Sequence, residues 1–212
     1  MVKSKRFWRQ KPSKTYEIDH SAFSAGFHVF ADGGCEPNPG PGGWGVAVYR
    51  DGVEIASDHG GDADTTNNRM ELTGLLKGIE AAKTLGAPVT IWCDSMYCVK
   101  GSNEWMHGWK KNGWQRGGPN ADPKNRILLN AELWQSIDAV LSSADQITIR
   151  WCKGHAGIVG NERADELSNL GMAAAVERRQ ALQSVTSNVT GVTERYEPGD
   201  YLTAQYRQIM GG

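Results

Sequence analysis

The spacing of hydrophobic residues changes along the chain, and this change restricts the possible folds more than any other feature. In residues 27–32, hydrophobic and polar positions alternate as they do in a strand. Similar runs occupy residues 44–50 and 53–57, with Asp51-Gly52 between them as a two-residue hairpin signal. The stretch 33–43 holds three prolines and five glycines, so we expect turns there. The chain is therefore predicted to open with three antiparallel strands.

From residue 65 onward the spacing becomes helical. Thr65 to Asn68 offer N-cap side chains, and leucine and isoleucine then recur every three to four residues as far as Leu85. The elements expected after this helix are a strand at 88–93, a short helix at 95–101, a basic aromatic stretch at 104–126, a helix at 127–141, a strand at 147–152 and a helix at 161–177. Three hairpin-linked strands followed by βαβ units predict an α/β fold with a five-stranded mixed sheet flanked by helices.

The two ends of the chain lack this patterning. We expect a basic, flexible N-terminal extension at 1–24, one folded domain at 25–180 and a polar, irregular C-terminal extension at 181–212. The first 14 residues carry six lysines and arginines and no acid, so this segment either contacts phosphates or forms a solvated leader. It is too short and too poorly patterned to be an independent domain.

Composition excludes several classes of protein. Hydrophobic residues make up 39% and charged residues 22% of the chain, as in soluble globular proteins. No apolar run approaches the roughly 18–20 residues of a membrane span, and no apolar stretch follows the basic N-terminus as in a secretory signal. The four cysteines form no C-x-x-C pair, so a zinc site is not expected. We expect a monomeric protein of the reducing cytoplasm that does not bind membranes.

Four acidic residues occupy positions where side chains could meet. Asp32 and Asp94 end predicted strands, and Glu71 and Asp165 lie in the first turns of predicted helices. Ligands of α/β sheets bind at the carboxyl ends of strands. Converging carboxylates repel one another and need a hard cation such as Mg²⁺ or Mn²⁺. Two such ions about 4 Å apart activate a water and stabilise the leaving oxygen of a phosphodiester.

The alternative is that these are unrelated surface acids, because the chain has 24 acidic residues and acids at helix starts also favour the helix dipole. The glycines favour the site. Gly33-Gly34 follow Asp32, and Gly74 and Gly78 lie three and seven residues after Glu71. A glycine inside a helix costs roughly 1 kcal/mol relative to alanine. Two of them on this face predict that the helix approaches the sheet closely beside Glu71.

Five motifs resemble those of type 1 ribonuclease H, in the family's order and with similar spacing, over roughly residues 25–177. The motifs are Asp32-Gly33-Gly34-Cys35 with 38–45 (NPGPGGWG), 66–72 (TNNRMEL), 93–95 (CDS) with Tyr97, 151–157 (WCKGHAG), and 161–165 (NERAD). The resemblance implies the ribonuclease H-like fold and an endonuclease that hydrolyses the RNA strand of RNA–DNA hybrids, leaving 3′-hydroxyl and 5′-phosphate ends.

The resemblance also implies roles for individual residues. Asp32, Glu71, Asp94 and Asp165 would bind two Mg²⁺ ions, with Mn²⁺ as a possible substitute. His155 would assist by moving protons or by helping the product to leave. Histidine titrates near neutrality, and glycines around His155 indicate a mobile loop, although a lone loop histidine is usually only solvated.

The substrate contacts implied by the resemblance are Gly33, Cys35, Asn38, Asn67, Asn68, Ser95, Trp109, Lys110, Lys111 and Asn161. Asparagine amides can reach minor-groove edges and the 2′-hydroxyls that distinguish RNA from DNA, although turn and cap chemistry would also explain them. Met96 departs from the pattern, because well-known members have a glutamine there.

Residues 105–116 are rich in tryptophan, lysine and arginine and resemble the basic protrusion of the bacterial branch, which grips phosphates of the DNA strand. Trp105 and Trp109 share a helix face, and we favour the interpretation that they pack this helix onto the next one. Two other functions remain open: a DNA-directed or transposase-like nuclease of the same fold, and a hybrid-binding protein without catalysis. The asparagine motifs and the basic segment argue against the first alternative, and the intact carboxylates argue against the second.

Overall fold

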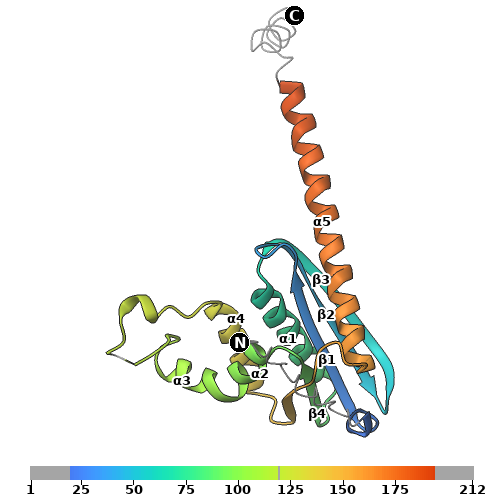
Figure 1. Ribbon diagram of the computed structural model, residues 1–212, viewed down its shortest axis with the longest axis vertical. Coiled ribbons are helices and arrows are strands. Elements are labelled where there is room, and N and C mark those ends of the chain that lie inside the picture. Colours follow the sequence, from blue (N-terminus) through green and yellow to red (C-terminus); the bar gives the residue numbers. More distant parts are fainter. Residues whose placement is uncertain (1–19, 119, 194–212) are drawn as a thin grey trace, which may run out of the picture.

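One mixed sheet forms the centre of the molecule (Figure 1). The computed structural model describes residues 20–118 and 120–193. Within them the strands are β1 (Phe27–Cys35), β2 (Gly40–Arg50), β3 (Val53–Thr65), β4 (Val89–Cys93) and β5 (Ile147–Trp151). Their order across the sheet is β3-β2-β1-β4-β5. The first three strands are antiparallel, whereas β4 pairs in parallel with both β1 and β5. The predicted five-stranded mixed sheet is therefore confirmed.

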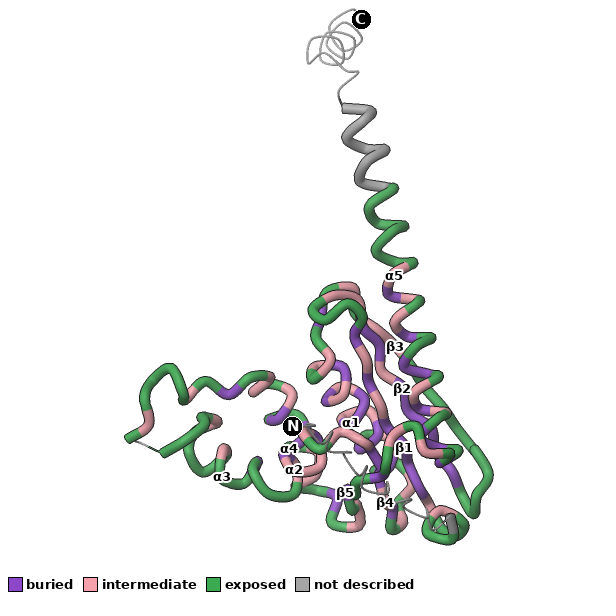
Figure 2. Tube along the Cα trace, viewed as in Figure 1, coloured by how far each residue is buried: buried purple, intermediate pink, exposed green. Residues whose placement is uncertain are grey.

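Helices cover both faces of this sheet. Val29 and Ala31 pack on one face with α1 (Asn67–Thr84), whereas Phe30 between them packs on the other face with α5 (Val159–Thr193). The face of α1 also carries a series of short helices: α2 (Met96–Lys100), the π-helical η2 (Gly101–Trp105), α3 (Met106–Lys111) and α4 (Ala131–Leu141). Figure 2 shows that the buried positions gather along the sheet and on the helix sides that face it. Because side chains alternate between the two faces along β1, this strand contributes residues to the hydrophobic cores on both sides of the sheet.

The first two strands are longer than predicted. β1 and β2 pair as far as Cys35 and Gly42, so most of the stretch expected to form turns belongs to the sheet. The glycines there allow close packing. A Cβ on Gly43 would lie 2.0 Å from the main-chain oxygen of Ser168, and one on Gly45 would lie 2.3 Å from that of Ala164. Helix α5 therefore packs directly on the backbone of β2, which explains glycine without requiring a turn.

Both ends of the domain also differ from expectation. Residues His20–Phe23 form a 3-10 helix, η1, and the Phe23 ring packs 4.8 Å from that of Trp92. At the other end α5 runs to Thr193, so the irregular structure expected from residue 181 is wrong as far as that point. Arg178 and Arg179 of this helix donate to main-chain oxygens of β3, at 2.9 and 3.2 Å. The remaining parts of both predicted extensions, 1–19 and 194–212, lie outside the described residues.

The segment between β4 and β5 contains one further correction. Helix α4 begins at Ala131 and not at residue 127, because Asn130 adopts a left-handed conformation with φ of 57°. A short 3-10 helix, η3 (Pro123–Asn125), precedes it. Among the described residues, no helix combines the length and the apolar character that crossing a membrane requires.

Candidate active site

The sheet brings Asp32 and Asp94 together. Parallel pairing of β1 with β4 ends at Phe30 and Trp92, and continuing this register by two residues sets Asp32 beside Asp94. Asp94 directly follows β4, as predicted. Asp32 does not end β1, because β1 continues to pair with β2 as far as Cys35. Asp32 instead lies two residues beyond the point where the pairing of β1 with β4 ends.

Helix α1 approaches this point closely enough to deliver Glu71. A Cβ on Gly74 would lie 2.4 Å from the main-chain oxygen of Asp32, and a Cβ on Gly33 would lie 2.4 Å from the nitrogen of Glu71. A Cβ on Gly78 would reach Val29 at 3.3 Å. The close approach predicted from these helix glycines is confirmed. It sets the first turns of α1 against the strand that carries Asp32.

Two neighbours hold the Glu71 carboxylate. The Asn67 amide donates to Oε1 at 2.9 Å, and the Ser95 hydroxyl donates to Oε2. Ser95 also caps α2 by accepting from the Cys98 main-chain N–H at 3.4 Å. The Asn67 main-chain N–H donates to the Asn38 side chain at 3.3 Å, which links the β1–β2 loop to the start of α1. Asn67 and Ser95, expected as substrate contacts, thus also orient a site carboxylate.

The four acids share one electrostatic environment. Burial raises the pKa of Asp32 from 3.8 to about 7, with further increases from the charges of Asp94, Asp165 and Glu71, opposed by the Gly33 N–H. Burial and the Asp94 charge also raise the pKa of Glu71, against the hydrogen bonds from Ser95 and Asn67. No salt bridge in the described part of the chain involves any of the four. Negative charge at this site is therefore not neutralised by the protein.

Asp165 and His155 come from the segment after β5. Asp165 lies in the second turn of α5, where the Asn169 amide donates to its main-chain oxygen at 3.0 Å. Its neighbours on the helix pack on the glycines of β2, which fixes this turn against the sheet. His155 is exposed in the β5–α5 loop and has a φ of 48°. The structure thus places His155 on the predicted loop.

The donor set suits a hard divalent cation. All four side chains offer carboxylate oxygens, which Mg²⁺ and Mn²⁺ prefer. Within residues 20–118 and 120–193, no three acidic, histidine or cysteine side chains converge into a preformed cage for one ion. Mg²⁺ does not need such a cage, because it retains several waters and takes only one or two carboxylates. The half-buried carboxylates around Asp32, which no salt bridge of the described residues neutralises, therefore fit a cation-binding site.

The expected substrate contacts divide into two groups. Asn38, Asn68 and Lys111 are exposed, as contacts to a duplex must be. In contrast, Asn161 is only 1% exposed and its Oδ1 accepts from the Cys152 thiol at 3.2 Å, so its side chain does not face a substrate. Cys35 is also buried, and its thiol contacts main-chain oxygens of its own hairpin and of Thr65.

Two residues of the basic segment have partners within the fold. The Trp109 ring packs 5.8 Å from that of Trp105 and 5.2 Å from that of Trp134 of α4, which confirms the packing interpretation for Trp109 and leaves it only partly available to a duplex. Trp105 is 38% exposed, and among the described residues no ring contact joins it to α4. Lys110 forms an ion pair with Asp138 at 2.7 Å, so its charge is partly neutralised. Lys111 is therefore the better candidate for contact with phosphate.

Two contacts of Asp94 were missed from the sequence. The Trp151 indole donates to the Asp94 main-chain oxygen at 3.0 Å, and the Cα of Gly154 lies against the Asp94 carboxylate. Both residues belong to a motif noted for His155, but no periodicity or spacing indicated that they contact a carboxylate on another strand. The contact between Asn67 and Glu71 was accessible to sequence reasoning, because residues four apart on a helix are neighbours.

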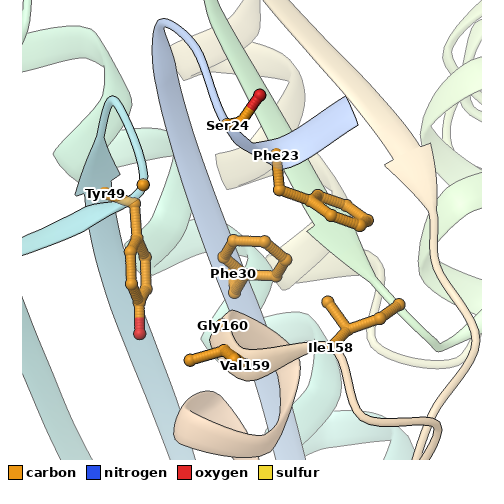
Figure 3. A pocket seen from close by; sticks show the side chains of 8 residues that line it. Phe23, Ser24, Phe30, Tyr49, Ile158, Val159 and Gly160 are labelled. Carbon is orange, nitrogen blue, oxygen red and sulfur yellow. The ribbon is translucent and has the colours of Figure 1, made fainter. Parts of the chain in front are cut away.

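A separate pocket of about 260 Å³ lies on the α5 face of the sheet (Figure 3). Its walls are mainly apolar, with the rings of Phe23 and Phe30 side by side and Ile158 and Val159 also lining it. No carboxylate lines it. This pocket is therefore not part of the acidic site.

Comparison with known proteins agrees with this geometry. Residues 24–173 match the family model described as RNase H. A ribonuclease H of Bordetella pertussis is 48% identical over 147 residues, which cover 69% of this chain and 89% of that protein. A ribonuclease H of Legionella pneumophila is 45% identical over 144 residues, covering 68% and 94%.

Solved structures give the same result. The N-terminal ribonuclease H domain of a Mycobacterium tuberculosis protein is 28% identical, with a TM-score of 0.54 and coverage of 74% of this chain and 99% of that one. A type 1 ribonuclease H described as having a type 2 active-site motif is 29% identical, with a TM-score of 0.58 and coverage of 72% and 74%. The family model and the relatives each span most of the residues that build the sheet and the four carboxylates, and the chain therefore belongs to the ribonuclease H family.

Proposed function

We propose that this protein hydrolyses the RNA strand of RNA–DNA hybrids at the site of Asp32, Glu71, Asp94 and Asp165. The cut is internal and leaves 3′-hydroxyl and 5′-phosphate ends. The observation that carries the proposal is the arrangement of the carboxylates: Asp32 on β1 is in register with Asp94 at the end of β4, and Glu71 lies where α1 packs on Asp32. Burial and the charges of the three other acids raise the pKa of Asp32. Such a site binds a cation and not a neutral ligand, and metal-assisted hydrolysis of phosphodiesters is the chemistry that such cations support.

The proposed cations are two Mg²⁺ ions, with Mn²⁺ as a substitute, held by the four carboxylates. When bound, they would lower the pKa of an attacking water and stabilise charge on the leaving oxygen. The protein's own contribution is orientation. Asn67 and Ser95 hold both oxygens of Glu71, and the close packing of Gly33 and Gly74 fixes α1 relative to Asp32. We infer that His155 assists by moving a proton or by helping the product to leave, and its exposure on the β5–α5 loop supports this role.

The proposed substrate surface begins at the acidic site and continues toward α3. Asn38 and Asn68 are exposed near the start of α1, where amides can donate to 2′-hydroxyls and to minor-groove edges. Lys111 lies at the end of α3 and would neutralise phosphate of the DNA strand. Amides that can bind 2′-hydroxyls, together with a lysine that can bind phosphate, support an RNA–DNA hybrid as the substrate over duplex DNA.

The test is cleavage of four matched end-labelled substrates: an RNA–DNA hybrid, duplex DNA, duplex RNA and single-stranded RNA. Each is incubated with Mg²⁺, with Mn²⁺ and with EDTA. We expect cutting of the RNA strand in the hybrid alone, abolished by EDTA, with 5′-phosphate ends that a phosphatase removes. Equal cutting of duplex DNA, or cutting in EDTA, would refute the proposal.

Cell location and assembly remain predictions. The four cysteines are all free, which is compatible with the reducing cytoplasm that we expect. A monomer is also expected, and sedimentation of the purified chain would test it.

A further inference from the structure

Two residues at and just after the end of β5 contact Asp94. The Trp151 indole N–H donates to the main-chain oxygen of Asp94 at 3.0 Å. A Cβ built on Gly154 would lie 2.2 Å from Oδ2 of Asp94 and 3.1 Å from its Cγ. One contact therefore binds the backbone of Asp94, and the other lies directly against its carboxylate.

A second hydrogen bond from the end of β5 also restrains the backbone at Asp94. The Cys152 main-chain N–H donates to the oxygen of Cys93 at 3.1 Å, at the end of the parallel pairing of β4 with β5. The oxygens of Cys93 and Asp94 belong to the two peptide groups on either side of the Asp94 Cα. With both oxygens bound by the end of β5, φ and ψ of Asp94 are restrained. The direction in which its Cβ leaves the backbone is restrained with them.

Gly154 then restricts the carboxylate itself. Its φ is not positive, so glycine is not required there by backbone conformation. Space restricts it instead, because the Asp94 carboxylate occupies the volume that a Cβ would fill. Any other residue would displace either the carboxylate or the loop that carries His155.

Packing alone does not account for Trp151. Its side chain is 46% exposed, so it contributes little to the core for a residue of its size. Its indole N–H nevertheless has a defined partner, which is the main-chain oxygen of Asp94.

We propose that Trp151 and Gly154 are positioning residues that fix the Asp94 carboxylate in the orientation that binds the divalent cation. This inference rests on the proposed function, because it assigns Asp94 to that cation. Partners of metal-binding side chains typically change metal affinity or activity by about 10- to 100-fold when they are removed.

The test uses Trp151→Phe, which keeps a ring but removes the donor, and Gly154→Ala, which adds only the Cβ. Trp92→Phe is the matched control for the first variant, since it removes an indole N–H bond of 3.0 Å that Trp92 of β4 donates to His28 of β1. Gly108→Ala is the control for the second, because a Cβ there meets nothing within 4 Å.

The first readout is the rise in Tm as Mg²⁺ is added to the full chain without substrate, which gives an apparent Kd for the metal. We expect Trp151→Phe and Gly154→Ala to raise this Kd about tenfold, and both controls to leave it unchanged even where their Tm is lower. The second readout is cleavage at increasing Mg²⁺. In both variants kcat should fall at low Mg²⁺, while the KM for hybrid and hybrid binding in EDTA stay unchanged.

Wild-type Mg²⁺ dependence in both variants would overturn the inference, as would a change no larger than that of the controls. Asp94→Asn separates this failure from failure of the proposed function. If Asp94→Asn loses metal binding and cleavage while the two variants behave like the controls, only the positioning role is wrong. If Asp94→Asn retains both properties, the proposed site itself is wrong.

Discussion

Replacing Asp32 with asparagine should stabilise the metal-free protein at neutral and higher pH. The carboxyl has a pKa of about 7 in the folded protein against 3.8 as its ordinary value. Because the folded pKa is the higher one, the folded state binds the proton more tightly than the unfolded state does. The free energy of unfolding of the metal-free protein therefore falls as the pH rises from about 4 to about 7, and the penalty is complete above that range.

The size of this penalty follows from the same values. At about 1.4 kcal/mol for each pKa unit, a rise from 3.8 to about 7 corresponds to about 4 kcal/mol. This is an upper limit, because the neighbouring acids also titrate and can move apart. We expect Asp32→Asn to raise the free energy of unfolding in EDTA by about 2 kcal/mol at pH 8 and by less than about 1 kcal/mol at pH 4.5.

The assay is urea unfolding followed by tryptophan fluorescence at both pH values, in EDTA and then in Mg²⁺. Asp145→Asn is the control, because Asp145 is an exposed aspartate that is not among the charges acting on Asp32 or Glu71. Added Mg²⁺ should stabilise the wild type more than Asp32→Asn, because ligand binding stabilises only a state that binds it. Equal or lower stability of Asp32→Asn at pH 8 in EDTA would refute the argument that charge accumulates at this site.

Three further predictions concern packing, orientation and substrate binding. Gly33→Ala should lower the free energy of unfolding by about 1–3 kcal/mol, whereas Gly34→Ala, where a Cβ meets nothing within 4 Å, should change it by less than about 0.5 kcal/mol in the same urea assay. Ser95→Ala should lower kcat about tenfold in steady-state kinetics with little change in KM, because it removes a donor to Glu71. Lys111→Ala should reduce the slope of log affinity against log salt by about 1 in hybrid-binding titrations, and Lys110→Ala should reduce it less, because Lys110 is already paired with Asp138.

Much of this architecture was predictable, since hydrophobic period distinguishes strands from helices. The alternation at Val29, Phe30 and Ala31 and the helical spacing after Asn67 are local properties of the chain. The glycine-rich stretch was misread for a physical reason. Glycine favours turns, but it also permits close contact between backbones, and only the position of α5 on β2 shows which property is used. The continuation of α5 was missed similarly, because Arg178 and Arg179 bind β3 oxygens more than a hundred residues away in sequence.

The residues of the site were also only partly predictable from local patterns in the sequence. Strand ends and helix glycines indicated Asp32, Asp94 and Glu71, whereas Asp165 and His155 depended on the motif resemblance. Whether a predicted contact residue can reach a substrate depends on its burial, which the sequence did not show. Asn161 has a side chain capable of binding a substrate but lies within the fold beside Cys152. Contacts between separate strands, such as Trp151 with Asp94, have no signature in local spacing.

The most direct test of the account compares Asp94→Asn with the wild type on one labelled RNA–DNA hybrid, measuring cleavage in Mg²⁺ and binding in EDTA. If Asp94 holds the catalytic cation, the variant loses Mg²⁺-dependent cleavage and still binds the hybrid with an affinity close to that of the wild type. Cleavage by Asp94→Asn at the wild-type rate would contradict the central claim that these carboxylates hold the metal that cuts the RNA strand.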